Sequence, residues 1–151
     1  MRKAEIIAAV VMSCVIALAA HVVADRQKSA VPVSAWLQTD EFYVSNALPG
    51  QDPILSARFL VLDDSEGFWV SEVQKLTVGT QWVPVCSSSG ITSMTPAFTR
   101  EYSWAEVVKA SCALAPGQYR LRMTFVLARP GWQPKRLSVT SNGFSVGGQD
   151  G

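Results

Sequence analysis

Apolar residues follow one another almost without interruption near the start of the chain. The run extends from Ile6 to Ala24, and only Ser13 and His21 interrupt it. A helix over residues 6–24 would be about 28 Å long at ~1.5 Å per residue, close to the ~30 Å hydrocarbon thickness of a bilayer. The pattern therefore predicts one hydrophobic helix within residues 1–24.

Beyond residue 34 the dominant hydrophobic period is two, as in strands. The clearest case is the segment 118–128, where apolar and polar residues alternate strictly. Its apolar positions share one face of a predicted strand: Tyr119, Leu121, Met123, Phe125 and Leu127. Alternation over this length is typical of a half-buried antiparallel strand. The same pattern predicts a strand over 55–61, and further strands at 35–38, 41–45, 68–77, 80–86, 97–104 and 136–146.

Turn-forming residues separate these predicted strands. They occur at 48–50, 63–67, 78–80 and 129–134, and are rich in Pro, Gly and Asp. Pro fixes φ, Gly accepts positive φ, and Asp hydrogen-bonds the local backbone, so each cluster favours a chain reversal. Outside the leader only 104–113 predicts a helical turn or two. The spacing is typical of strands joined by hairpins, and it predicts an all-β domain over 35–146. Residues 25–34 then form a short polar tether, and 147–151 form a disordered tail.

The leader allows two interpretations that give different proteins. Val22-Val23-Ala24 fits a secretory signal cleaved after Ala24, which would release a secreted or periplasmic domain. Retention of the leader would leave a single-pass anchor, and the apolar run is longer than most signal sequences contain. Arg2 and Lys3 at the N-terminus favour a cytoplasmic N-terminus. We expect a bacterial cytoplasmic membrane protein with its domain on the extracytoplasmic side, and keep cleavage as the alternative.

The start of the strongest predicted strand resembles a motif of known β-sandwiches. Residues 114–119, Leu-Ala-Pro-Gly-Gln-Tyr, look like the tyrosine corner of immunoglobulin-like and fibronectin type III-like domains. Smaller similarities to small bacterial immunoglobulin-like domains extend the resemblance to about 35–146. It implies an immunoglobulin-like antiparallel β-sandwich preceded by the hydrophobic helix. It also implies structural roles for the motif residues Leu114, Pro116, Gly117 and Tyr119, with the tyrosine bonded back to the preceding backbone. The Cys-Trp-Cys pattern of antibody domains is missing, because Trp82 precedes both later cysteines.

Two cysteines beyond the leader, Cys86 and Cys112, predict one disulfide in an exported chain. The bond would contribute roughly 3 kcal/mol by the loop-entropy estimate. Two buried free thiols are the alternative.

Composition and charge exclude several function classes. The chain has 151 residues, room for one ordinary domain, and 13 Lys and Arg face 12 Asp and Glu for a net charge of +1. This balance disfavours a nucleic-acid partner. The single histidine, His21, lies in the leader, so the body cannot build a histidine-dependent nucleophile or zinc site. Asp63, Asp64 and Glu66 cluster in a predicted turn, where solvated carboxylates are usual. We expect no catalytic residue, metal or cofactor.

Aromatic and basic residues are the remaining candidates for binding. Trp132 lies in the 129–134 turn and is expected to be exposed, while Arg120 and Arg122 occupy the polar face of the strongest strand. The leading hypothesis is a membrane-tethered, non-enzymatic binding or scaffolding domain that uses these three residues for an unknown protein partner. The alternative is a carbohydrate-binding module in which Trp132, with Trp69 or Trp104, stacks on a glycan.

Overall fold

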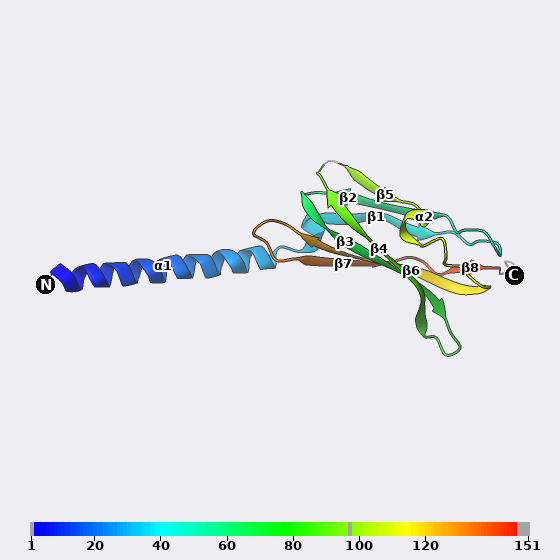
Figure 1. The fold of residues 1–151 in the computed structure, drawn as a ribbon, viewed down its shortest axis with the longest axis horizontal. Coiled ribbons are helices and arrows are strands. Elements are labelled where there is room, and N and C mark those ends of the chain that lie inside the picture. The colour runs from blue at the N-terminus through cyan, green and yellow to red at the C-terminus, as the bar shows by residue number, and fades with distance from the viewer. Residues whose placement is uncertain (1, 97, 148–151) are drawn as a thin grey trace.

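The structure, a computed structural model, describes residues 2–96 and 98–147. One long helix, α1 (Arg2–Ala30), precedes a body that is mostly β-strand (Figure 1). The strands are β1 (Leu37–Val44), β2 (Leu55–Val61), β3 (Ser65–Leu76), β4 (Trp82–Met94), β5 (Thr99–Tyr102), β6 (Gly117–Ala128), β7 (Lys135–Thr140) and β8 (Phe144–Val146). The short helices are the 3₁₀ turn η1 (Val33–Ala35) and α2 (Trp104–Val107).

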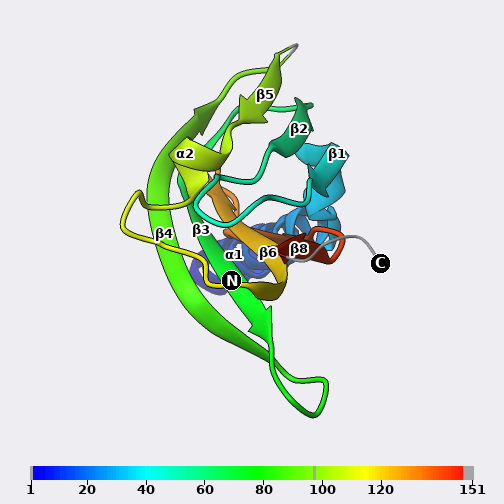
Figure 2. The same ribbon diagram turned by 90° about the vertical axis from the view of Figure 1, so that its right-hand side faces the viewer.

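The strands form two sheets in which all named pairs are antiparallel. One sheet has the order β1-β2-β5, and the other has the order β4-β3-β6-β7 with β8 also paired to β6. Figure 2 shows β3 and β4 on one side of the body and β1 and β2 on the other. Side chains of the two sheets meet in the core, where the rings of Phe59 on β2 and Phe125 on β6 lie 4.9 Å apart. The prediction of an antiparallel β-protein behind one apolar helix is confirmed at this level.

Strand β6 supplies the largest share of the core. Its apolar face is buried at every position that the alternation predicts: Tyr119, Leu121, Met123, Phe125 and Leu127. β6 pairs with β3 along ten positions and with β7 along six. A strand with two long neighbours needs a continuous apolar face to bury, which is why the strictest alternation in the chain marks this strand.

Other strand predictions differ in their limits. β2 has the predicted bounds, whereas the predicted pieces 35–38 and 41–45 join into β1, whose pairing shifts register between Thr39 and Glu41. β4 runs to Met94 rather than ending near Cys86, because pairing with β3 holds the Ser- and Gly-containing segment 87–90 extended. The predicted strand 136–146 is two strands that meet β6 at different points. Of the predicted tail 147–151, residues 148–151 lie outside the described residues.

Helix α1 continues past the predicted leader. The segment 25–34, expected as a polar tether, is helical to Ala30 and then turns through η1. Residues Val10–Ala30 are long and apolar enough to cross a membrane, and the structure buries none of this stretch. The helix projects from one end of the body, close to its long axis (Figure 1).

The end of α1 is fastened to the loop between β6 and β7. Lys28 Nζ donates a hydrogen bond to the carbonyl of Gly131 at 2.9 Å. Lys135 Nζ donates to the carbonyls of Ser29 at 2.8 Å and Lys28 at 3.3 Å, which are otherwise unpaired groups of the last helical turn. The last turn of α1 is therefore hydrogen-bonded both to the β6–β7 loop and to the first residue of β7.

Gly67 offers a sharp test of the packing between β3 and β6. A Cβ atom there would lie 2.0 Å from the carbonyl oxygen of Val126, so Gly67→Ala must push the two strands apart. We expect a loss of about 1–3 kcal/mol in the free energy of unfolding, measured by urea denaturation of the full chain in detergent. Gly143→Ala is the matched control, because its Cβ would come no closer than 3.9 Å to a neighbour. Equal stability of the two variants would contradict this packing.

Candidate partner-binding surfaces

The five-stranded sheet presents one face to solvent, called here the outer face. Its side chains alternate along each strand with those that enter the core. The register aligns Ile91 of β4, Phe68 of β3, Val126 of β6 and Arg136 of β7 in one row across the sheet. The row crosses all four main strands of this sheet, so a partner lying on it would contact each of them.

Three of the four residues in this row, Ile91, Phe68 and Val126, are apolar. Ile91 is 91% exposed and Phe68 is 47% exposed, although both lie in the middle of paired strands. They border a hollow of about 710 Å³, and Phe68 also borders a second hollow of about 230 Å³ that reaches Glu72 and Arg122. Exposed apolar side chains that adjoin concave surface are typical of docking sites.

Strand β4 adds an open edge beside this apolar row. It ends the strand order of its sheet, so within the described part of the chain its backbone pairs only with β3. None of its 13 residues is charged. Proteins usually protect long edge strands with charges, prolines or bulges, and here only Pro84 and the register shift near it do so. From Ser87 to Met94 the edge is unprotected.

The predicted binding residues Arg120 and Arg122 both lie on the outer face. The Arg120 guanidinium stacks 4.5 Å from the ring centre of Trp82, and its Nε donates to Gln74 at 2.7 Å. Arg120 is therefore held by its own sheet. Arg122 is exposed and lies opposite Glu72 in the register. Arg122 is the more available of the two for a partner.

Trp132 is not an exposed loop residue as expected. It is half-buried, and its ring packs edge-on against the buried Trp36 with ring centres 5.8 Å apart. The Arg129 guanidinium lies 5.3 Å from the Trp132 ring centre. Nine residues of nearly extended chain, roughly 30 Å, separate Arg120 from Arg129. The structure thus places Trp132 at the opposite end of β6 from Arg120 and does not combine them in one site.

The other tryptophans do not form stacking platforms. Trp69 and Trp104 are each only 6% exposed and belong to the core. Trp69 packs over Gly90, where a Cβ would lie 2.6 Å from the indole ring. Trp82 is half-buried beneath Arg120. Trp69 and Trp104 therefore do not offer the open ring faces that the glycan-binding alternative assigns to them.

Cys86 and Cys112 lie within disulfide-bonding distance, with their Cα atoms 5.9 Å apart. The pair connects β4 to the segment between α2 and β6. Cys14, the remaining cysteine, is free and exposed on α1.

The residues of the predicted tyrosine corner lie at the start of β6. The buried Tyr119 donates its hydroxyl hydrogen to the carbonyl of Ala115 at 2.5 Å. Its ring stacks on Phe144 of β8, and Leu114 packs against the core. The carbonyl of Pro116 accepts a hydrogen bond from Lys75 of β3, and a Cβ at Gly117 would lie 2.8 Å from that lysine side chain. These contacts hold the β6 terminus in place.

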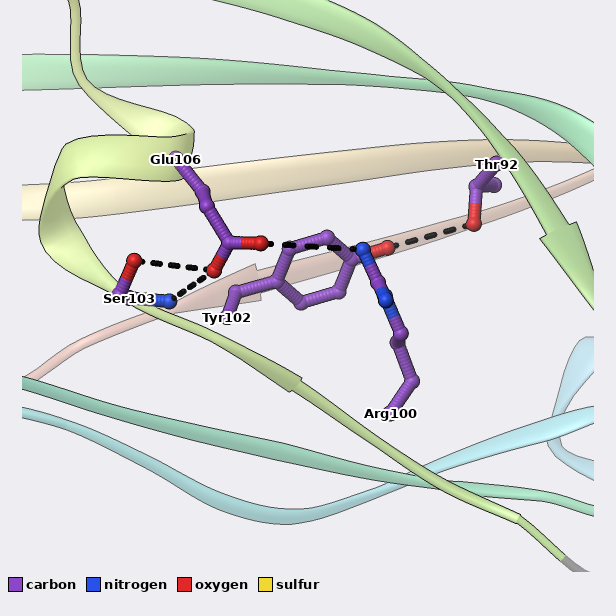
Figure 3. Close-up of polar contacts among 5 residues, drawn as sticks. All are labelled: Thr92, Arg100, Tyr102, Ser103 and Glu106. Atoms are coloured by element: carbon purple, nitrogen blue, oxygen red, sulfur yellow. Dashed lines mark hydrogen bonds and ion pairs between the residues drawn. The ribbon is translucent and has the colours of Figure 1, made fainter.

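A polar cluster links β4, β5 and α2 (Figure 3). Glu106 accepts hydrogen bonds from the backbone N–H and the hydroxyl of Ser103, at 2.7 and 2.9 Å. Arg100 lies 3.9 Å from the same carboxylate and stacks on Tyr102, whose hydroxyl is 3.3 Å from that of Thr92. The hydrogen bond from the Ser103 backbone, followed by the bond from its hydroxyl, lowers the pKa of Glu106 below its ordinary value of 4.5. Desolvation raises this pKa by a smaller amount, and the charge of Arg100 lowers it slightly further. The cluster caps α2 and connects the two sheets.

The acidic residues of the 63–67 turn have structural partners or face solvent. Asp63 forms an ion pair with Arg129 and accepts a hydrogen bond from the Asp64 backbone. Asp64 and Glu66 border a hollow of about 560 Å³ together with Arg129. Among the described residues, no three His, Cys, Asp or Glu side chains group as a metal site would require.

No protein family matches the chain, and no curated protein matches its sequence.

The cap of α2 gives a pH-dependent prediction. Because the folded pKa of Glu106 is lowered, its stabilising effect is complete above the unfolded pKa and is lost as the pH falls through the folded pKa. Glu106→Gln should therefore lower the unfolding midpoint in urea at pH 7 but have a much smaller effect at a pH low enough to protonate Glu106 in the folded chain. The exposed neighbour Glu101→Gln is the control. A Glu106→Gln effect of the same size at both pH values would rule out the charged cap.

Proposed function

We propose that this protein is a non-enzymatic binding domain of the bacterial cell envelope, anchored in the cytoplasmic membrane by α1 and folded as an immunoglobulin-like β-sandwich. The domain lies on the extracytoplasmic side, and its partner is a protein that docks on the outer face. The exposed apolar row of Ile91 and Phe68 beside the unprotected edge of β4 is the observation that carries this proposal.

The strand order supports the immunoglobulin-like assignment. Such sandwiches place their first, second and fifth strands (A, B and E) in one sheet and C, F and G in the other. Here β1, β2 and β5 form one sheet, and β3, β6 and β7 are neighbours in the other, with β4 as an added strand beside β3. The hydroxyl of Tyr119 bonds back to Ala115 at the start of β6, which is the F position.

The contacts at the end of α1 support a retained anchor. Cleavage after Ala24 would leave only residues 25–30 of the helix, and isolated helices of that length are unstable in water. The bonds from Lys135 to the last helical carbonyls depend on that turn being formed. The apolar stretch Val10–Ala30 of α1 is not buried by the rest of the structure, and a bilayer would cover it.

The cysteine pair supports the extracytoplasmic side. Cys86 and Cys112 are placed for a disulfide, and disulfides persist in oxidising compartments outside the cytoplasm.

The anchor is tested by the intact mass of the native protein in membrane and soluble fractions of its host. We expect the full-length mass in the membrane fraction, with a loss of about 2 Da relative to the reduced chain if the cysteine pair is bonded, since each disulfide removes two hydrogens. A soluble species that lacks residues 1–24 would contradict the anchored form.

The docking face is tested with two exposed isoleucines, Ile91 on the outer face and Ile54 before β2. A photo-crosslinking residue at position 91 should capture a discrete protein partner in intact cells, and the same residue at position 54 should not. Ile91→Asp should reduce co-purification of that partner at least about tenfold, the effect of losing ~1.4 kcal/mol of apolar contact, whereas Ile54→Asp should leave it unchanged. Equal crosslinking at positions 91 and 54 would contradict a docking site on the outer face.

A further inference from the structure

Three cations and two tryptophans surround the end of α1. We call Lys28, Trp36, Arg129, Trp132 and Lys135 the juxtamembrane cluster. Its cations lie near its aromatic rings: Lys28 Nζ is 6.0 Å from the Trp132 ring centre, and the Arg129 guanidinium is 5.4 Å from that of Trp36. None of these contacts belongs to the outer face, so docking of a protein partner there does not account for the clustered cations and tryptophans.

The length of the helix places this cluster relative to a bilayer. If the hydrocarbon core ends near Ala24, where the apolar run ends, Lys28 lies four residues further, about 6 Å at ~1.5 Å per residue. The polar headgroup layer on each side of the core is about 5–8 Å thick. Lys28 therefore lies in the headgroup layer, and its 2.9 Å bond to Gly131 brings the β6–β7 loop to the same depth.

The chemistry of the cluster suits that depth. Trp132 is half-buried, so part of its ring stays exposed beside the helix, and tryptophan is favoured where an apolar ring meets a polar interface. Lys28 uses one of its three N–H donors on Gly131, which leaves two for other acceptors. Arg129 pairs with Asp63 but has five N–H donors.

Charge around the helix end includes both signs. Arg26 is exposed two residues before Lys28, and Arg136 follows Lys135 at the start of β7. The nearby carboxylates are Asp25 on α1, Asp63 and Asp64 in the loop before β3, and Glu66 at the start of β3, and Asp63 is already paired with Arg129. The cations at this end thus outnumber the unpaired carboxylates.

We infer that the juxtamembrane cluster binds the headgroups of anionic phospholipids, with Trp132 at the interface and with Lys28, Arg129 and Lys135 supplying the positive charge that attracts lipid phosphates. This inference rests on the proposed membrane anchor and goes beyond it, because it assigns a lipid-binding role to a loop of the β-domain. Each cation near an anionic bilayer surface adds about fivefold to the local preference for anionic lipid.

The test uses the full chain in nanodiscs of phosphatidylcholine that contain a fixed fraction of headgroup-nitroxide phosphatidylcholine. Subtracting the fluorescence of the Trp132→Phe variant from that of the wild type isolates the emission of Trp132. Comparing this emission with and without the nitroxide lipid then gives the quenching of Trp132. We expect clear quenching by the headgroup nitroxide. Replacing one third of the unlabelled lipid by phosphatidylglycerol should reduce it about twofold or more, because the anionic lipid displaces the labelled lipid from the cluster. Replacement by neutral phosphatidylethanolamine should leave it unchanged.

Two further measurements separate charge from folding. Lys28→Gln should weaken the effect of phosphatidylglycerol, and the exposed Lys109→Gln should not. Salt at 1 M should abolish the effect in the wild-type chain without any substitution, since it screens charges over distances of about 3 Å.

The inference is overturned if Trp132 is not quenched, or if phosphatidylglycerol and phosphatidylethanolamine act alike. Either result with the chain inserted in the nanodisc leaves the anchor intact. Failure of the full chain to insert would instead overturn the proposed function.

Discussion

Burial of the apolar face of β6 is the constraint on which the rest of the structure depends. This strand pairs with β3, β7 and β8, and its five inward side chains lie at the centre of the core. Phe125 touches the opposite sheet through Phe59, so β6 also holds the two sheets together. Full burial of such a side chain contributes about 1.5–3 kcal/mol, more than any single surface contact in the molecule.

The two ends of β6 then determine what surrounds it. At its start, the Tyr119 hydroxyl bond and the pairing with β8 close the core away from the helix. At its end, the chain turns at Gly131 and reaches α1, where Lys28 and Lys135 fasten the helix to the loop. The single strand β6 therefore spans the distance between the helix junction and the far end of the domain. The helix is bonded to the same strand–loop unit that organises the core.

The sequence predicts well those elements whose pattern is local. Strict alternation places β6 and β2, and Ile6–Ala24 marks the apolar part of α1. The segment 87–94 of β4 lacks such a pattern, because its extended form depends on pairing with β3. The prediction for Trp132 fails for a similar reason: a loop position usually indicates exposure, but Trp132 is half-buried because its ring packs against Trp36, which is 96 positions away in the chain. The apolar row on the outer face also depends on contacts between residues that are distant in the sequence, because Ile91 and Phe68 become neighbours only through the pairing of β3 with β4.

The fixed junction also limits what can occupy the edge of β4. The end of β4 at Met94 pairs with Ser65, beside the end of β6 that leads to the helix, so β4 runs toward the α1 end of the domain. In the proposed anchored form, two copies in one membrane have parallel helices, and both β4 strands run toward that membrane. Antiparallel pairing of the two edges would require one copy to be inverted. In that form, a strand added antiparallel to β4 would come from a different protein or from a segment that runs away from the membrane, and antiparallel edge pairing between two copies is disfavoured.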